Sequence, residues 1–184
     1  IFMREEEKLA HDVYVMLYQQ YGLTLFNNIA TSEATHMASI KTLLDRYGLV
    51  DPVTGNGVGE FENATLQALY TQLIAQGSQS LSAALKVGAA IEEIDILDLK
   101  ARSATTTHSD IQQVYNQLLN GSYNHLRSFT NTLKTQTGEV YQPQHLDAAT
   151  YQTILSGSNG RRGGSSMGSS SAIGSGSSRG GRRW

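Results

Sequence analysis

The sequence predicts an all-α protein: a bundle of four long helices with one long connection between the second and the third. Apolar residues recur at helical spacing along four stretches of the chain, and these stretches lack the alternation that is typical of strands. Glycine or a capping residue stands at most of the expected helix ends. A short helix in the long connection and another after the fourth long helix complete the predicted fold.

Glycines and capping residues indicate where each element begins and ends. Gly22 and Gly48 follow the first two long helices, where glycine readily adopts the left-handed conformation. Asn63, Ser78 and Asp147 are the expected N-caps of three later helices. The expected helices span residues 2–21, 24–47, 64–77, 79–102, 109–135 (or 110–135) and 148–155.

Residues 157–184 differ in composition from the rest of the chain. They contain nine glycines, nine serines and five arginines, so we expect a flexible tail after a bundle of residues 1–156. The tail carries +5, whereas the first 156 residues carry nine basic against sixteen acidic residues, a net −7. These opposite charges predict that the tail docks on an acidic protein surface, such as that of a second copy in a homo-oligomer. A solvated linker is the alternative.

Composition excludes several classes of protein. The chain has no cysteine, which removes disulfide scaffolds, thiolate metal sites, iron–sulfur clusters and cysteine nucleophiles. No apolar run reaches the ~18 residues of a membrane span. An acidic body also argues against nucleic-acid binding. The small number of lysines, among many Ser, Thr, Asn and Gln, favours an exported or cell-surface protein over a cytoplasmic one.

Three of the long helices place polar side chains inside the apolar stripe that should face the core. Projected at about 100° per residue, each stripe contains two polar residues three positions apart, which therefore point into the same space. These pairs are Glu33 and His36, Glu92 and Asp95, and Ser122 and His125. Glu93 instead shares a face with two lysines and is expected in solvent, as are His11, His108 and His145.

The inward carboxylates indicate a metal site. A carboxylate in an apolar core is costly unless it is paired or bound to a metal. Several carboxylates in one core also repel one another, and a pair of divalent cations relieves this most simply. Oxygen and imidazole ligands without sulfur suit iron or manganese and permit zinc. A single Glu-x-x-His is common without metal, but its coincidence with two further inward pairs predicts a two-metal site.

Four segments carry these motifs: residues 5–14 (EEEKLAHDVY), 32–37 (SEATHM), 91–95 (IEEID) and 121–127 (GSYNHLR). They resemble the ferritin-like proteins of the rubrerythrin type, in a branch known as a domain of unknown function. The resemblance covers about residues 3–156. It implies a ferritin-like four-helix bundle with a di-iron carboxylate site.

The resemblance also implies the metal ligands, which are Glu7, Glu33, His36, Glu92, Asp95 and His125. Glu7 is followed by alanine three and tyrosine seven residues on, like the family's first-helix glutamate, although the helical wheel places Glu6 nearer the centre of its stripe. Ser122 departs from the family, which has a glutamate there. Asp95 is the available substitute for that carboxylate, and Ser122 is expected to line a small opening or hold a water. Tyr14 is either a hydrogen-bond donor near the metals or a packed core residue.

The reaction that the resemblance implies is oxidation of ferrous iron or reduction of peroxide, at two metals that Glu33 or Glu92 bridges. Glu7 and His36 would complete one metal, and Asp95 and His125 would complete the other. Rubrerythrins usually also carry a cysteine-ligated electron-transfer iron, which this chain cannot build. The alternative function is a non-catalytic assembly or surface-attachment module with a structural or vestigial metal site, for which the Gly/Ser/Arg tail would serve as a tether.

Overall fold

The computed structural model describes residues 1–157, which fold as six helices without a strand. The helices are α1 (Phe2–Tyr21), α2 (Thr24–Arg46), α3 (Ala64–Gly77), α4 (Leu81–Thr105), α5 (Ser109–Thr137) and α6 (Ala148–Ser156). The predicted all-α class is therefore confirmed. Apart from its first residue, the expected tail lies outside the described residues. No helix in the described part of the chain is long and apolar enough to cross a bilayer.

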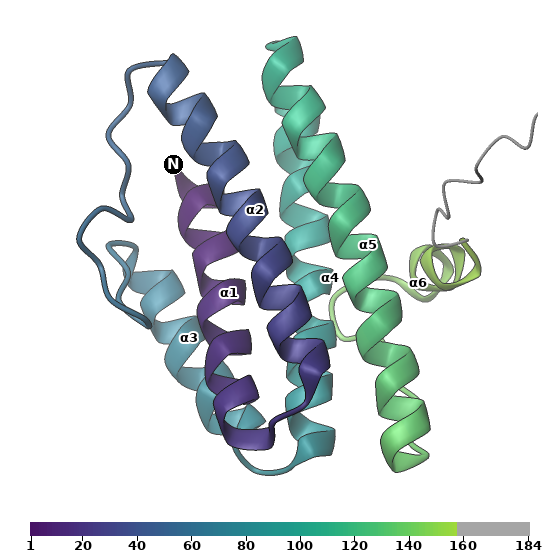
Figure 1. Cartoon of the computed structure of the whole chain (residues 1–184). Coiled ribbons are helices and arrows are strands. Elements are labelled where there is room, and N and C mark those ends of the chain that lie inside the picture. The colour runs from purple at the N-terminus through teal and green to yellow at the C-terminus, as the bar shows by residue number, and fades with distance from the viewer. Residues whose placement is uncertain (158–184) are drawn as a thin grey trace, which may run out of the picture.

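The four long helices form two antiparallel pairs that face each other (Figure 1). α1 packs along α2 and α4 packs along α5, and the pairs meet through α2 against α5 and α1 against α4. After α2 the chain descends outside the bundle to α3, which packs against α1 and α4. α6 packs against α5. The space between the two pairs is therefore lined by one face of each long helix.

Most of the helix ends follow the local sequence as expected. Gly22 ends α1 in the left-handed conformation with φ 64°, and Asn63 and Asp147 cap α3 and α6 with their side chains. The prediction of Ser78 as the cap of α4 is wrong, because Ser78 keeps helical dihedral angles at the end of α3. Ser80 is extended and accepts a hydrogen bond from the backbone N–H of Ala83, so it is the N-cap.

Three aromatic rings form the centre of the apolar core. Tyr14, Phe26 and Phe129 are fully buried, and the Phe129 ring centroid lies 5.1 Å from that of Tyr14 and 5.8 Å from that of Phe26. The close approach of α4 to α5 depends on Gly88, since a Cβ there would lie 2.5 Å from the Phe129 ring. Packing at this density leaves no room for a side chain at that position.

Charged residues on the outer side of α1 hold the long connection in place. The Arg4 guanidinium forms a two-pronged ion pair with Asp51, with both N···O distances 3.0 Å. Glu5 Oε1 accepts hydrogen bonds from the backbone N–H groups of Glu62 and Asn63, at 2.6 and 3.1 Å. The acidic start of α1 therefore does more than complement the helix dipole: Glu5 positions the beginning of α3.

The expectation that Glu93 is solvated is wrong. Its side chain is fully buried, and Oε2 accepts hydrogen bonds from the backbone N–H groups of Gln144, His145 and Leu146, at 2.9, 2.5 and 3.0 Å. The segment between α5 and α6 folds over this face of α4, which the helical period of α4 alone does not reveal. Glu93 therefore holds that segment against the bundle.

Glu93→Gln should lower the free energy of unfolding by about 2–4 kcal/mol, because a neutral amide oxygen accepts from three N–H groups more weakly than the carboxylate oxygen does. Urea unfolding of the metal-free protein measures the change. Glu139→Gln is the control, since Glu139 pairs with Lys86 at the exposed surface and should matter much less. An unfolding free energy equal to that of the wild type for Glu93→Gln would contradict this role.

Candidate metal centre

Half of the acidic residues lie inside the protein. The buried ones are Glu5, Glu6, Glu7, Asp12, Glu33, Glu92, Glu93 and Asp95, eight of the sixteen in the chain. Only two of the nine basic residues of the bundle, Arg4 and Lys8, are buried with them. The negative charge of the bundle is therefore concentrated in its interior, and the surface of the described residues is close to balanced. Docking of the basic tail on an acidic surface stays a prediction.

Three of these buried carboxylates have donors on the outer faces of the bundle. Glu5 and Glu93 accept the backbone hydrogen bonds described above, and Asp12 pairs with Lys8 and accepts from the backbone N–H of Gly59 at 2.9 Å. The other five carboxylates come from α1, α2 and α4, and two imidazoles come from α2 and α5. These seven buried groups form the candidate metal centre.

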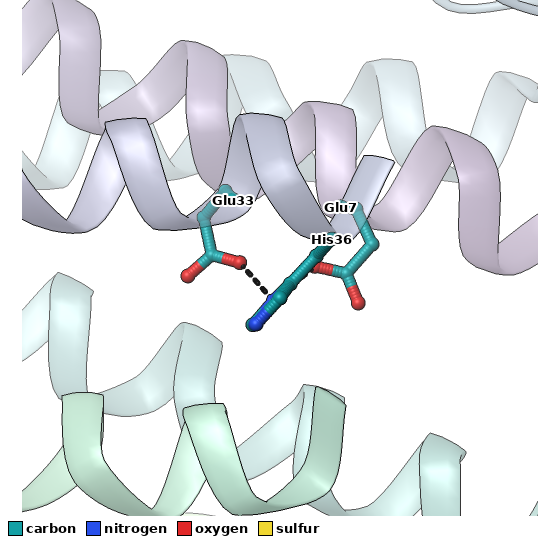
Figure 2. Close-up of side chains that lie close together, drawn as sticks. All are labelled: Glu7, Glu33 and His36. Atoms are coloured by element: carbon teal, nitrogen blue, oxygen red, sulfur yellow. Dashed lines mark hydrogen bonds and ion pairs between the residues drawn. The ribbon is translucent and has the colours of Figure 1, made fainter. Parts of the chain in front are cut away.

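Glu7, Glu33 and His36 form the first ligand group of the centre. Their side chains point from α1 and α2 toward α4 and α5 (Figure 2). His36 Nδ1 lies 2.7 Å from Glu33 Oε2 and 3.2 Å from Glu7 Oε2. One ligand atom from each residue lies within 4.8 Å of the others, which is compact enough to hold a metal ion.

Glu33, Glu92 and His125 form the second ligand group, within the same 4.8 Å limit. His125 Nδ1 lies 2.7 Å from Glu33 Oε1 and 3.5 Å from Glu92 Oε2. Glu33 therefore belongs to both groups and directs one carboxylate oxygen to each imidazole. The rings of His36 and His125 stack with their centroids 5.6 Å apart.

The carboxylates hold both imidazoles in the charged form. Burial alone would lower the pKa of His36, but hydrogen bonds and charges from Glu33 and Glu7 raise it to about 11. Burial likewise disfavours a charged His125, but the Glu92 charge and contact with Glu33 raise its pKa to about 10. Burial would raise the pKa of Glu33, and the two imidazoles overcome this and hold it well below its ordinary value.

The remaining carboxylates of the centre have raised pKa values. Burial raises the pKa of Glu7 to about 8, against the stabilising hydrogen bond from His36. Burial also raises the pKa of Glu92, and burial with the charges of Glu7 and Glu92 raises that of Asp95 well above its ordinary value. Without a cation, the centre therefore holds its negative charge at a cost.

Four buried carboxylate oxygens of the centre have no hydrogen bond of good geometry. Among residues 1–157 they are Glu6 Oε2, Glu7 Oε1, Glu33 Oε1 and Asp95 Oδ1, of which Glu33 Oε1 forms an ion pair with His125. Buried polar atoms almost always have a hydrogen-bond partner, so these oxygens stand out as lone pairs in the interior that no hydrogen-bond donor occupies. The donor set of carboxylate oxygens and imidazole nitrogens is chemically suited to a divalent cation. The residues present therefore fit a metal pair.

Asp95 and Glu6 lie outside both ligand groups. Asp95 Oδ2 accepts a hydrogen bond from Ser122 Oγ, and Ser122 is fully buried, so it holds Asp95 instead of lining an opening. That Asp95 binds metal stays a prediction. Glu6 is buried near Asp95 and Asp98, and burial with these neighbours raises its pKa well above its ordinary value. The structure thus brings Glu7, and not Glu6, into the first group.

Tyr14 donates a hydrogen bond to Glu92 Oε1 at 2.6 Å and also lies 3.3 Å from the carbonyl oxygen of Gly88. The phenol is fully buried, so it both packs in the core and orients a ligand.

Of the histidines expected at the surface, His108 and His145 are exposed, whereas His11 is half-buried against Asp12, with Nδ1 2.9 Å from Oδ1.

Two residues that contact the imidazoles were not predicted from the sequence. A Cβ on Gly121 would lie 2.6 Å from both Cε1 and Nε2 of His36, so α5 approaches the ring of α2 only because this residue is glycine. The signal available was a glycine inside a long helical pattern. Ser32 Oγ lies 3.0 Å from His125 Nε2. A serine next to Glu33 carries no comparable signal.

Gly121→Ala should weaken binding of one metal ion, because the new Cβ displaces His36 from the first group while the second group keeps its residues. Isothermal titration with Mn(II) should show one strong step in place of two. Gly77→Ala is the matched control, since Gly77 ends α3 and its Cβ would meet Leu17. Two Mn(II) binding steps with wild-type affinity in Gly121→Ala would contradict this role of the glycine.

Comparisons with known proteins agree with this fold. The chain is 45% identical over 161 residues to the uncharacterized protein MJ0754 of Methanocaldococcus jannaschii, covering 88% of this chain and 86% of that protein. It also superimposes on the crystal structure of hypothetical protein MJ0754 from Methanococcus jannaschii DSM 2661, with TM-score 0.84 and 46% identity, covering 86% of this chain and 90% of that one. Residues 1–158 match the family described as uncharacterized protein domain DUF2202. The chain therefore belongs to the DUF2202 family.

Proposed function

We propose that this protein is a ferritin-like carboxylate protein that holds two divalent metal ions, iron in the first place with manganese or zinc as alternatives, and that it oxidises ferrous iron or reduces peroxide. The observation that carries the proposal is the position of Glu33 in both ligand groups. One carboxylate oxygen faces each imidazole Nδ1, 2.7 Å away in both cases. This favours Glu33, over Glu92, as the residue that bridges the ions.

Charge balance supports two ions. The first ion would be held by Glu7, Glu33 and His36, and the second by Glu33, Glu92 and His125. With Asp95 close by, the centre contains four carboxylates besides Glu6, and two divalent ions would neutralise them with both imidazoles uncharged. One ion would leave two buried negative charges, which cost several kcal/mol each unless protonated.

When bound, a pair of redox-active ions would supply two electrons at one place and a positive clamp for dioxygen or peroxide. The residues of the chain exclude water and fix the ligands. The carboxylates of Glu7, Glu33 and Glu92 are at most 3% exposed, whereas the imidazoles are 10–11% exposed. Tyr14 orients Glu92, and its phenol proton lies within hydrogen-bond reach of the centre.

Turnover tests the enzymatic part of the proposal. Iron-loaded wild-type protein should reduce peroxide with added Fe(II) as the electron donor, or oxidise added Fe(II) with dioxygen as the electron acceptor, over many cycles. Glu33→Gln should lose both ions, with a fall in affinity beyond the ~10–100-fold typical of residues that only support ligands, and should lose turnover with them. Glu93→Gln, another buried glutamate, should keep two ions and full turnover.

Peroxide reduction is measured by the fall in peroxide concentration, and iron oxidation is measured by the absorbance of Fe(III). Wild-type protein with two bound iron ions and neither activity would contradict the enzymatic reading and would favour a non-catalytic module. Two ions in Glu33→Gln at wild-type affinity would contradict the bridging role instead.

Metal-dependent stabilisation should increase with pH. Folding raises the pKa of Glu7 from 4.5 to about 8, and those of His36 and His125 from 6.5 to about 11 and about 10. The folded metal-free protein therefore holds more protons than the unfolded chain, so its stability falls as pH rises from about 5 to about 10. Metal ions displace those protons and bind better as pH rises.

The difference in Tm between Mn(II)-saturated and metal-free protein should therefore widen between about pH 6 and about pH 8. Thermal scans at a fixed concentration of free Mn(II) measure it, with Glu33→Gln as the control that should show almost no difference. A difference that stays constant across this range would show that metal does not compete with these protons.

A further inference from the structure

We propose that Ser32 is a positioning residue of the metal centre: its hydroxyl fixes the ring of His125 so that Nδ1 faces the ligand carboxylates. The inference rests on the proposed metal centre but concerns a residue that belongs to neither ligand group. Ser32 lies on α2, whereas His125 lies on α5, so the contact also joins the two helix pairs.

The two ring nitrogens of His125 contact two successive residues of α2, Glu33 and Ser32. Nδ1 lies 2.7 Å from Glu33 Oε1, and Nε2 lies 3.0 Å from Ser32 Oγ. α2 therefore holds both edges of the ring. A half-turn of the ring would put Cδ2 in place of Nδ1 and Cε1 in place of Nε2, and both contacts would be lost.

The contact selects the form of imidazole that binds metal. A ligating imidazole uses the lone pair of one nitrogen, so its proton is on the other nitrogen. When a metal ion displaces the Nδ1 proton, Nε2–H would donate to Ser32 Oγ and the Nδ1 lone pair would face Glu33 and Glu92. An acceptor placed at Nε2 also increases the basicity of Nδ1.

His36 has no such support. Its Nδ1 faces Glu33 and Glu7, but within the described part of the chain no residue hydrogen-bonds to its Nε2, which packs against Gly121. The two imidazoles of the centre are therefore held differently. Loss of the Ser32 hydroxyl should affect the ion bound by His125 and leave the ion bound by His36 in place.

Ser32→Ala and Ser32→Thr test the inference in the full chain, with Co(II) as the probe. Ser39→Ala is the matched control, because Ser39 also lies on α2 but its hydroxyl donates to the Thr35 carbonyl of its own helix. Circular dichroism confirms that each variant is folded. Co(II) titration should show one of two binding steps weakened by about 10–100-fold in Ser32→Ala, and wild-type binding in Ser32→Thr and Ser39→Ala.

Proton NMR of the Co(II)-loaded protein adds a readout that a change in packing would not produce. Each cobalt-bound imidazole N–H gives a strongly shifted, exchangeable signal. In the wild type the His125 signal should exchange slowly with water, and Ser32→Ala should speed that exchange about tenfold, as expected for loss of one hydrogen bond. Ser32→Thr should keep the slow exchange.

Wild-type affinity and exchange in Ser32→Ala would overturn the role of Ser32 while leaving the metal centre intact. Equal weakening of both steps would also overturn it, because the effect would then not be specific to His125. A wild-type protein that does not bind two Co(II) ions would overturn the metal centre itself, together with this inference.

Discussion

The repulsion among four buried carboxylates, those of Glu7, Glu33, Glu92 and Asp95, is the constraint on which the rest of this structure depends. Helices α1, α2 and α4 place these groups in one water-poor space, where each negative charge disfavours the others. Without metal, the compensation that residues 1–157 supply within the space comes from two imidazolium groups and the hydroxyl donors of Tyr14 and Ser122. Protonation and metal binding are the two ways of relieving the repulsion, and they compete. The proposed function follows from metal binding.

The bundle meets this constraint by keeping its other buried charges on separate faces. The outer side of α1 uses Arg4 and Glu5 to hold the long connection, and α4 uses Glu93 to hold the segment before α6. Each of these charges has its own donors or counter-ion. Sequence neighbours therefore have unrelated roles: Glu5 and Glu7 are two residues apart, yet one supports the fold and the other faces the metal centre. The helical period separates them by about 200°.

Much of this could be predicted from the sequence, because helical period and i, i+3 spacing are local. Glu33 and His36 stand on the inward stripe of α2 in any bundle, so their meeting required no knowledge of the partner helices. The burial of Glu93 could not be predicted, since it depends on a segment without helix or strand that lies 51–53 residues further along the chain. The same is true of Ser32 and Gly121, whose importance arises only where α2 and α5 touch. Period and spacing specify what faces inward, whereas contacts between helices decide which inward groups meet.

Anomalous diffraction from crystals of the iron-loaded protein tests the central claim most directly. Data collected above and below the iron absorption edge locate each ion without reference to any assumed ligand. The account predicts two iron peaks, about 3.5–4 Å apart, on either side of the Glu33 carboxylate, one beside His36 Nδ1 and the other beside His125 Nδ1. A single peak, or two peaks that do not share Glu33, would contradict it.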